Sequence, residues 1–400
     1  MEINKQLAKE LEVQEWQVDA AVKLIDEGNT IPFISRYRKE ATGSLNDEIL
    51  RKLFERLTYL RNLEEKKQQV LSVIEEQGKL TPELKKQILA AETLVVVDDL
   101  YRPYRPKRRT RATIAKEKGL EPLANLIRLQ LTKRPLGEDA KAFLSEEKEV
   151  LTVEDALNGA RDILAEAISD EADYRIHIRD LTMKEGTLIS TARDEKAQSV
   201  YENYYSYEEP VSKVAGHRIL AINRGEKEKF LTVKVGAPEE RILRYLEKMV
   251  ISNENPHTTP VLKEVIADSY GRLIAPAIER EIRNVLTEKA EDGAITVFGK
   301  NLTQLLMQPP IAGQVVLGWD PAFRTGCKLA IVDATGKVLD TTVIYPTAPT
   351  TEKKIHDAKE TLKKLISKYH VTLFSVGNGT ASRESEQIIV ELLKEIPEKV

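Results

Sequence analysis

Apolar residues at helical spacing dominate the start of the chain. They recur at intervals of three, four and seven residues, which predicts one face of a pair of short helices. A polar break at residues 12–14 lets these helices turn on each other, and Gly28 ends the second. The recurring apolar residues are Leu7, Leu11, Val18, Val22 and Ile25.

A long amphipathic helix is predicted from Leu45 to Gln77. Its apolar positions form one stripe, and Glu, Lys and Arg fill the remaining faces. Gly78 is suited to end this helix, and Thr81 followed by Pro82 is typical of the start of the next. The stripe consists of Leu50, Leu53, Phe54, Leu57, Leu60, Leu63, Val70, Leu71 and Ile74.

Other stretches depart from this helical pattern. Pro32 predicts a non-helical segment from Ile31 to Gly43. Two short apolar runs, residues 218–223 and 229–235, flank Arg224-Gly225-Glu226 and predict a small β-hairpin that lies against helices. Further helices are expected over residues 113–131, 139–144, 152–191, 239–249, 259–289 and 301–307.

Strands alternate with helices after Pro309-Pro310 and Gly313, which mark a domain boundary. Three strands followed by helix, strand and helix is the opening order of an RNase H-like domain. The fourth strand would be left as an unpaired edge, so we expect the chain to be a piece of a longer protein. The predicted elements are strands at 314–319, 328–332 and 338–345, a helix at 352–369, a strand at 372–376 and a helix at 382–395.

These patterns predict a mostly α, multidomain protein. A helical region with one small β-hairpin precedes the first part of an α/β RNase H-like domain. We place the domains at residues 1–200, 201–312 and 313–400, since four hundred residues are too many for one ordinary core. A composition of 41% hydrophobic and 31% charged residues suits such a chain.

Cysteine and histidine usage excludes several classes of site. Cys327 is the only cysteine, so neither an internal disulfide nor a cysteine-rich zinc site is expected. The five histidines are scattered without metal-ligand spacing, and we expect no cofactor and no metal. No apolar run approaches the roughly 18 residues that span a bilayer, and the first residues lack a secretory signal. A cytoplasmic protein without a membrane partner is therefore expected.

Positive charge concentrates in one segment, although the whole chain carries a formal net charge of −3. No acidic residue occurs from Leu100 to Lys116, and two prolines prevent a regular helix there. Arginine can bind phosphate with two hydrogen bonds, and Tyr101 and Tyr104 offer flat surfaces for base stacking. The cations of this first candidate for nucleic-acid binding are Arg102, Arg105, Lys107, Arg108, Arg109 and Arg111.

The basic run also has a structural interpretation. It could be a solvated connector, or its arginines could pair with an acidic helix such as the one that contains Glu64 and Glu65. If all six cations contacted single-stranded phosphates, the slope of log K against log salt would be about −4, from roughly −0.7 per contact.

A second candidate for nucleic-acid binding follows Pro32. Its cations, Arg36, Arg38 and Lys39, could contact further phosphates. The same loop could instead be structural, with Phe33 and Tyr37 inserted into the core. Both interpretations stay open at this point.

Asp320 ends the first strand of the RNase H-like region. Active nucleases of this fold use an acid here to bind one of two metal ions that activate water. Where a second acid would be needed the chain has Asn378, a neutral residue that holds Mg²⁺ weakly, and Asp333 is expected to point away. We therefore expect no nuclease activity. Asp320 more naturally caps the following turn or pairs with Arg324.

Four stretches of the chain resemble the bacterial Tex family, transcription accessory proteins with a YqgF (RNase H-like) domain. These stretches are long and idiosyncratic, and the resemblance covers essentially all 400 residues. They are residues 31–43 (IPFISRYRKEATG), 98–111 (DDLYRPYRPKRRTR), 318–330 (GWDPAFRTGCKLA) and 377–384 (GNGTASRE).

The resemblance implies an N-terminal helical region with helix-turn-helix character and a YqgF domain. It further implies helix-hairpin-helix repeats and a C-terminal OB-fold RNA-binding domain, neither of which this sequence contains. It also implies an architectural kinship with eukaryotic transcription elongation factors.

We therefore predict a non-catalytic, nucleic-acid-binding transcription accessory protein. Its expected partner is RNA or DNA, with RNA polymerase or the ribosome as candidate protein partners. A monomer is expected because no sustained coiled-coil seam is present. The alternatives are a metal-dependent RNase H-like nuclease or Holliday-junction resolvase, and a scaffold that binds proteins alone.

Overall fold

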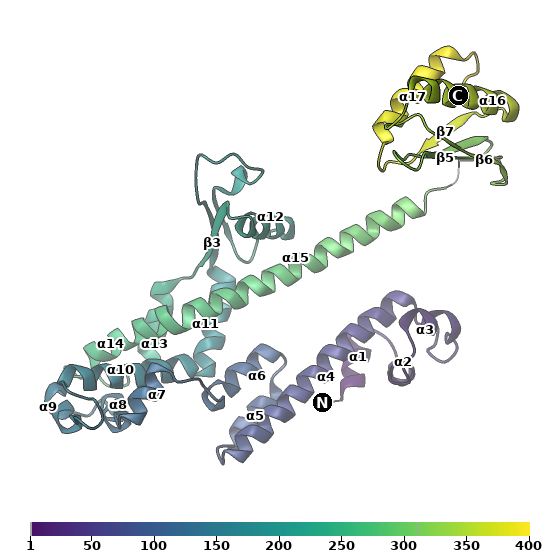
Figure 1. Ribbon diagram of the computed structural model, residues 1–400. Helices are drawn as coiled ribbons and strands as arrows, with labels where there is room; N and C mark the ends of the chain where they lie inside the picture. The colour runs from purple at the N-terminus through teal and green to yellow at the C-terminus, as the bar shows by residue number, and fades with distance from the viewer. Residues whose placement is uncertain (1, 310) are drawn as a thin grey trace. The chain divides into compact units, whose positions relative to one another are not determined.

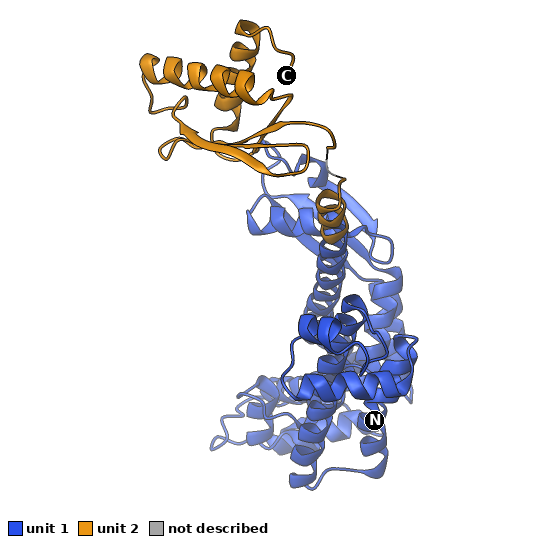
Figure 2. Cartoon of the chain, turned by 90° about the vertical axis from the view of Figure 1, so that its right-hand side faces the viewer, with its two compact units in different colours: residues 1–297 blue, residues 298–400 orange. Residues whose placement is uncertain are grey.

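Helices account for most of the computed structural model, which describes residues 2–309 and 311–400 (Figure 1). The chain forms two units, residues 1–297 (unit 1) and residues 298–400 (unit 2) (Figure 2). The predicted class, mostly α and multidomain with an α/β C-terminal region, is confirmed. Pro310, half of the expected boundary pair, lies outside the described residues. Among the described residues, no helix is both long and apolar enough to cross a membrane.

The N-terminal helices pack on the first half of one long helix. The predicted amphipathic helix is confirmed, and Asn46 begins it by accepting the N–H of Ile49 at 2.8 Å. Buried leucines of its stripe, such as Leu50 and Leu53, form a core with the short helices before it. The elements are α1 (Ile3–Glu10), α2 (Glu15–Asp26), α3 (Ile31–Tyr37) and α4 (Asp47–Glu76).

The non-helical segment predicted after Pro32 is wrong in its first part, because residues Ile31–Tyr37 form α3, whereas residues 38–43 are not helical. Pro32 lies in the first turn of that helix, where a backbone N–H has no partner inside the helix. Proline therefore starts α3 instead of breaking it, and Ile34 becomes a fully buried residue of the first core.

The second half of α4 builds a separate core with the next two helices. Leu63 and Ile74 of α4 pack there with Ile88 and Val97. The predicted helix start at Thr81 is confirmed, since its hydroxyl accepts the N–H of Leu84 at 3.2 Å. The added helices are α5 (Pro82–Ala90) and α6 (Leu94–Tyr101).

The largest core of unit 1 lies among the helices that follow. α10 is central to it and contacts α7, α8, α9 and α14. One π-helical stretch, Ser269–Ile274, joins α14 directly to α15. The helices are α7 (Arg111–Glu117), α8 (Glu121–Leu129), α9 (Leu136–Ala140), α10 (Val153–Asp170), α11 (Ala172–Glu185), α12 (Gly216–Lys227), α13 (Glu239–Val250), α14 (Thr259–Asp268) and α15 (Ala275–Leu306).

The predicted hairpin is wrong in its first strand, because residues 218–223 lie in α12. Ile219 and Ile222 are buried one helical turn apart, and Gly225 leaves space for the side chain of Leu231. Only the second apolar run forms a strand, β3. Its partner is β1, at the end of the range 152–191, where a helix was expected instead. The antiparallel sheet has the order β2-β1-β3, with β1 (Thr187–Ala192), β2 (Ser206–Pro210) and β3 (Leu231–Gly236).

Every strand and helix predicted after residue 313 is confirmed. β7 pairs in parallel with β4 at one edge of a sheet of order β6-β5-β4-β7, and the other pairs are antiparallel. Leu317, Trp319 and Cys327 lie in the core of unit 2. The elements are β4 (Val316–Asp320), β5 (Cys327–Val332), β6 (Val338–Ile344), α16 (Glu352–Tyr369), β7 (Leu373–Val376) and α17 (Ser382–Glu395).

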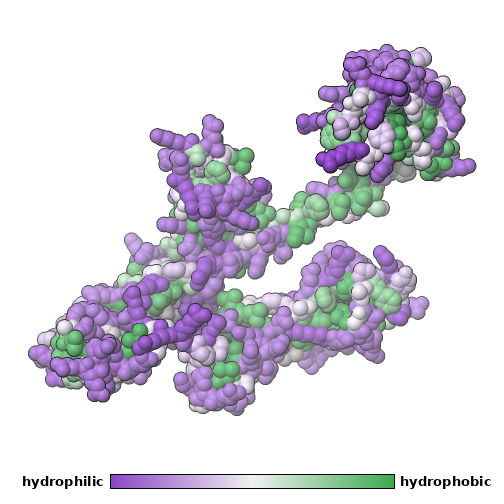
Figure 3. All heavy atoms as spheres, in the orientation of Figure 1, coloured by the Kyte–Doolittle hydropathy of each residue, from purple (hydrophilic) through white to green (hydrophobic). Residues whose placement is uncertain are grey.

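The end of α15 exposes an apolar face. The break expected between residues 289 and 301 is wrong, because one helix runs from Ala275 to Leu306. Its last turns expose Phe298, Leu302 and Leu305 to solvent, and apolar surface is visible along this helix in Figure 3. These residues lie on one helical face, but they belong to none of the four cores of the described chain.

Two glycines in helices of unit 1 should respond oppositely to replacement by alanine. A Cβ on Gly159 of α10 would lie 2.3 Å from Cδ1 of the buried Leu120, whereas a Cβ on Gly293 of α15 would meet nothing within 4 Å. We expect Gly159→Ala to destabilise unit 1 by about 1–3 kcal/mol through overpacking. Gly293→Ala should instead be neutral or stabilise by about 0.5–1 kcal/mol. Urea unfolding followed by circular dichroism measures both, and equal effects would contradict the packing of α10.

Candidate nucleic-acid interface

The basic segment, residues 102–111, connects α6 to α7. Its first three residues, Arg102–Tyr104, form a short 3₁₀ turn, and the chain is non-helical from there to Thr110. Thr110 then starts α7 by accepting the N–H of Thr113 at 3.1 Å. The expected loss of regular helix at the two prolines is confirmed.

Two of the six cations are anchored to the end of α10. Arg102 donates from Nε to Oδ1 of Asp170 at 3.2 Å, and Lys107 pairs with Oδ2 of the same carboxylate. Lys107 also lies 3.4 Å from Glu166. Burial raises the pKa of the Asp170 carboxyl, although Lys107 and Arg102 act in the opposite direction.

Arg102 and Lys107 therefore pair with acidic residues, as the structural interpretation of the basic run proposed. Their partners are other acids than the expected ones. The anchoring acids lie on α10 and not on the helix that contains Glu64 and Glu65. This pairing could not be predicted from local sequence, because Asp170 follows Arg102 by 68 residues.

The last two cations of the segment also have acidic neighbours. Arg109 donates to Glu117 at 3.2 Å, and both side chains are largely exposed. Arg111 contributes to the lowered pKa of Asp268, whose main cause is the hydrogen bond from Arg272. The surface pair of Arg109 with Glu117 is weak, and no ion pair of Arg111 occurs among the described residues, so both arginines are able to bind a ligand.

Arg105 and Arg108 differ from the other four cations. Both are exposed, and neither has an acidic partner among the described residues. They alternate with the anchored Arg102 and Lys107 along the segment. The anchors thus hold the backbone while these two guanidinium groups stay free for an external anion.

The two tyrosines of the segment are not free stacking surfaces. Tyr101 and Tyr104 are half-buried and pack against the core of α4, α5 and α6. Lys66 lies 5.8 Å from the centre of the Tyr101 ring. The tyrosines thus secure the segment to the helices behind it, and only part of each ring is exposed for the expected stacking on bases.

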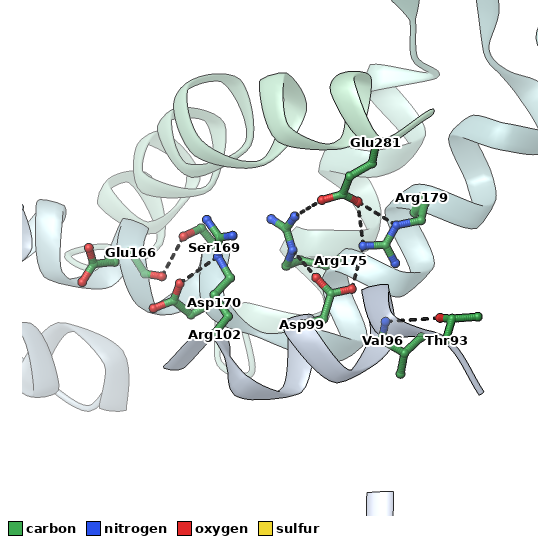
Figure 4. Close-up of polar contacts among 10 residues, drawn as sticks. All are labelled: Thr93, Val96, Asp99, Arg102, Glu166, Ser169, Asp170, Arg175, Arg179 and Glu281. Carbon is green, nitrogen blue, oxygen red and sulfur yellow. Dashed lines mark hydrogen bonds and ion pairs between the residues drawn. The ribbon is translucent and has the colours of Figure 1, made fainter. Parts of the chain in front are cut away.

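A buried ion network fixes α6 beside the segment (Figure 4). Arg175 of α11 donates to Asp99 at 2.7 Å and to Glu281 of α15 at 2.8 Å. Arg179 donates to the same two acids at 2.6 and 2.8 Å. Burial opposes the charge of Arg179, but Asp99 and Glu281 outweigh it and raise the pKa of this guanidinium.

Sequence reasoning missed all four members of this network. The only local signal is the helical spacing of Arg175 with the buried Ile178 and Thr182, which places a charge on the inner face of α11. A charge at such a position requires a buried partner, but the spacing does not identify which acid supplies it.

The second candidate cluster lies at the other end of α4. α3 packs on the first half of this helix, whereas the core beside the basic segment uses the second half (Figure 1). Arg36 and Lys39 are exposed without an acidic partner among the described residues. Arg38 covers the half-buried Phe33, 4.9 Å from its ring centre. No polar contact in the described chain joins this cluster to the basic segment.

The structural alternative for this cluster fails for one of its two aromatic residues. Tyr37 is largely exposed and lies 5.4 Å from the Phe33 ring, so it does not enter the core. Ile34 occupies that position instead. The cluster therefore offers exposed cations and one exposed aromatic side chain.

Asp320 of the RNase H-like region is 73% exposed at the end of β4. Its cationic neighbour is Lys328 at 3.9 Å, across the strand pair, and not the expected Arg324. Asp333 caps the turn after β5 by accepting the N–H groups of Thr335 and Lys337. Within the described parts of the chain, no group of three or more His, Cys, Asp or Glu side chains is placed to hold a metal ion.

Comparisons with known proteins agree with these elements. Three family models match the chain: the Tex-like protein N-terminal domain at residues 1–75, the Tex central region at residues 132–298 and the Tex protein YqgF-like domain at residues 314–400. The basic segment lies between the first two matched ranges.

Relatives match along nearly the whole chain. The uncharacterized protein YdcI of Bacillus subtilis is 50% identical over 100% of this chain and 56% of its own length. The transcriptional accessory protein Tex of Neisseria gonorrhoeae is 38% identical over 100% of this chain and 52% of its own. The human S1 RNA-binding domain-containing protein 1 is 30% identical over 97% and 40%. The chain spans about half the length of the curated relatives that it matches, and it belongs to the Tex family.

Proposed function

We propose that this chain binds RNA or DNA through its basic segment as a non-catalytic transcription accessory protein. The single observation that carries the proposal is the pair Arg105 and Arg108, which are exposed and without acidic partners and which alternate with the anchored Arg102 and Lys107. The names of two relatives support it, since one is a transcriptional accessory protein and another is named for an S1 RNA-binding domain.

Anchoring improves this surface as a phosphate-binding site. Arg102 and Lys107 tie the backbone to α10 on either side of Arg105. Less conformational freedom of the segment is then lost when a strand binds. Free guanidinium groups on a fixed backbone can form paired hydrogen bonds with phosphate oxygens.

The finer features of the function belong to the same proposal. RNA polymerase or the ribosome is the proposed protein partner, and the protein acts as a cytoplasmic monomer. The cluster of Arg36, Arg38 and Lys39 supplies a second, weaker contact at the other end of α4. Helix-turn-helix character in the N-terminal helices stays a prediction.

The test is a double substitution of the two free arginines. We expect Arg105→Gln with Arg108→Gln to weaken binding of a single-stranded oligonucleotide by about 10- to 100-fold, at roughly 0.7–1.4 kcal/mol per lost contact. The slope of log K against log salt should become less steep by about 1.4, or roughly 0.7 per contact. Fluorescence anisotropy across a salt series measures both quantities.

A matched control removes the same charge elsewhere. Arg224 and Arg244 are both exposed, and within the described residues the ion pair of each is with a glutamate one helical turn away. Arg224→Gln with Arg244→Gln should leave the affinity and the salt slope nearly unchanged. If both double variants weaken binding equally, net charge governs it and the proposed interface is wrong.

The non-catalytic part of the proposal has its own test. The lone exposed Asp320 and the neutral Asn378 argue against a two-metal site. Labelled RNA and DNA should remain intact with Mg²⁺ or Mn²⁺ while they shift in a gel. Cleavage that Asp320→Asn abolishes would establish the nuclease alternative instead.

A further inference from the structure

A cavity of about 660 Å³ lies beside the basic segment. Residues of α6, of the segment and of the end of α10 line it, together with side chains from α11 and α15. Arg105 and Arg108 are among the lining residues, so the two cations without acidic partners border the same space. Its volume lies within the range of ordinary ligand sites, about 300–1,000 Å³.

Every acid that lines this cavity already has a cation. Asp98 lies 3.3 Å from Lys66. Asp99 and Glu281 belong to the buried network with Arg175 and Arg179, and Asp170 and Glu166 hold the two anchors of the basic segment. The charges of Arg105 and Arg108 are therefore left without compensation, and the cavity favours an anion.

Arg175 supplies a second, independent observation. Its side chain is 1% exposed, and its Nη1 has no hydrogen-bond partner among the described residues. Figure 4 shows its guanidinium group between Asp99 and Glu281 on one side and the end of α10, with Ser169 and Asp170, on the other. A buried N–H group without an acceptor is rare in native proteins and indicates that an acceptor is missing.

We propose that this cavity binds a phosphate group. The negatively charged oxygens of a phosphate group accept hydrogen bonds, which matches one unpaired buried donor and two free guanidinium groups. The space also exceeds the needs of a single phosphate, so an attached nucleoside fits. This site extends the proposed function. It rests on that function in one respect, because a bound nucleic-acid strand is one source of the phosphate. A free mononucleotide or inorganic phosphate is the other source.

Calorimetric titration of the whole chain with inorganic phosphate and with adenosine monophosphate tests the site. We expect binding with a Kd of about 1 mM or tighter, a range suited to one small anion. Arg105→Gln with Arg108→Gln should weaken it at least tenfold, whereas Arg224→Gln with Arg244→Gln should not. Hydrogen exchange should slow with phosphate in peptides that cover α6 and the end of α10, because those elements line the cavity.

The outcomes separate this site from the proposed function. If neither phosphate compound binds while oligonucleotide binding still depends on Arg105 and Arg108, the cavity proposal is overturned and the function stands. If both compounds bind as expected but no oligonucleotide does, the cavity holds a free nucleotide and the proposed function falls. Phosphate binding that the Arg105 and Arg108 substitutions leave unchanged lies elsewhere and overturns the site.

Discussion

Replacing Asp99 by alanine is expected to destabilise unit 1 by about 3–5 kcal/mol, the usual effect of removing one partner from a buried ion network. Asp99 accepts hydrogen bonds from both Arg175 and Arg179, and its side chain is almost fully buried. After the substitution, Glu281 alone faces two guanidinium groups that are shielded from water. The uncompensated charge, and not the lost contact by itself, is the main cause of the effect.

Asp98 is the matched control for this prediction. It is the adjacent residue of the same helix, and its side chain is 54% exposed with a single surface pair to Lys66. Asp98→Ala should therefore change the free energy of unfolding by at most about 1 kcal/mol. Urea denaturation followed by circular dichroism compares the two variants, and equal losses would show that the network is not buried in solution.

A compensating substitution tests the cause. Arg175→Met added to Asp99→Ala removes the second charge and leaves Arg179 paired with Glu281 at 2.8 Å. Replacement of a whole buried pair by apolar groups is often close to neutral, so the double variant should regain most of the lost stability. If it is as unstable as Asp99→Ala alone, the loss arises from packing of α6 and not from charge.

The network also explains how the basic segment is held. Asp99 lies three residues before Arg102, on the helix that ends where the segment begins. α6 is tied to α11 and α15 by this network, and the segment is tied to α10 by Asp170. The basic segment is thus fixed by two groups of ion pairs, each formed between residues far apart in the chain.

The spacing of apolar residues predicted helices and strands correctly where one spacing, helical or alternating, continued over enough residues. α4 and the whole of the RNase H-like region are examples, because their apolar spacing is regular and their ends carry turn residues. The prediction of a hairpin was wrong because the run at residues 218–223 is short. Its apolar pattern fits a strand as well as a helical turn that buries both Ile219 and Ile222.

The candidate site was predicted only in part, for a physical reason. A run of cations is visible in the sequence, but ion pairing depends on acids that folding brings from distant positions. Asp170 and Glu166 neutralise Arg102 and Lys107, and no local pattern indicates this. In the structure, two of the six cations are anchored to α10, whereas Arg105 and Arg108 are exposed and have no acidic partner among the described residues.

Leu317→Ala is expected to destabilise unit 2 by about 2–5 kcal/mol, the range for a large-to-small substitution in a packed core. Leu317 is 0% exposed in β4, which pairs with β5 on one side and β7 on the other. Leu305 in the last turns of α15 is the control, since it is 63% exposed. Leu305→Ala should change the stability of unit 2 by no more than about 0.5 kcal/mol.

The chain offers a specific probe for this comparison. It has two tryptophans, and Trp319 is buried on the same face of β4 as Leu317. In a Trp16→Phe background the fluorescence change on urea unfolding reports on unit 2 alone. Equal losses for Leu317→Ala and Leu305→Ala would mean that the exposed face of α15 contributes to folding as a core does. A large loss for Leu317→Ala alone would instead show that this apolar face does not stabilise unit 2, so its side chains are free to contact another surface.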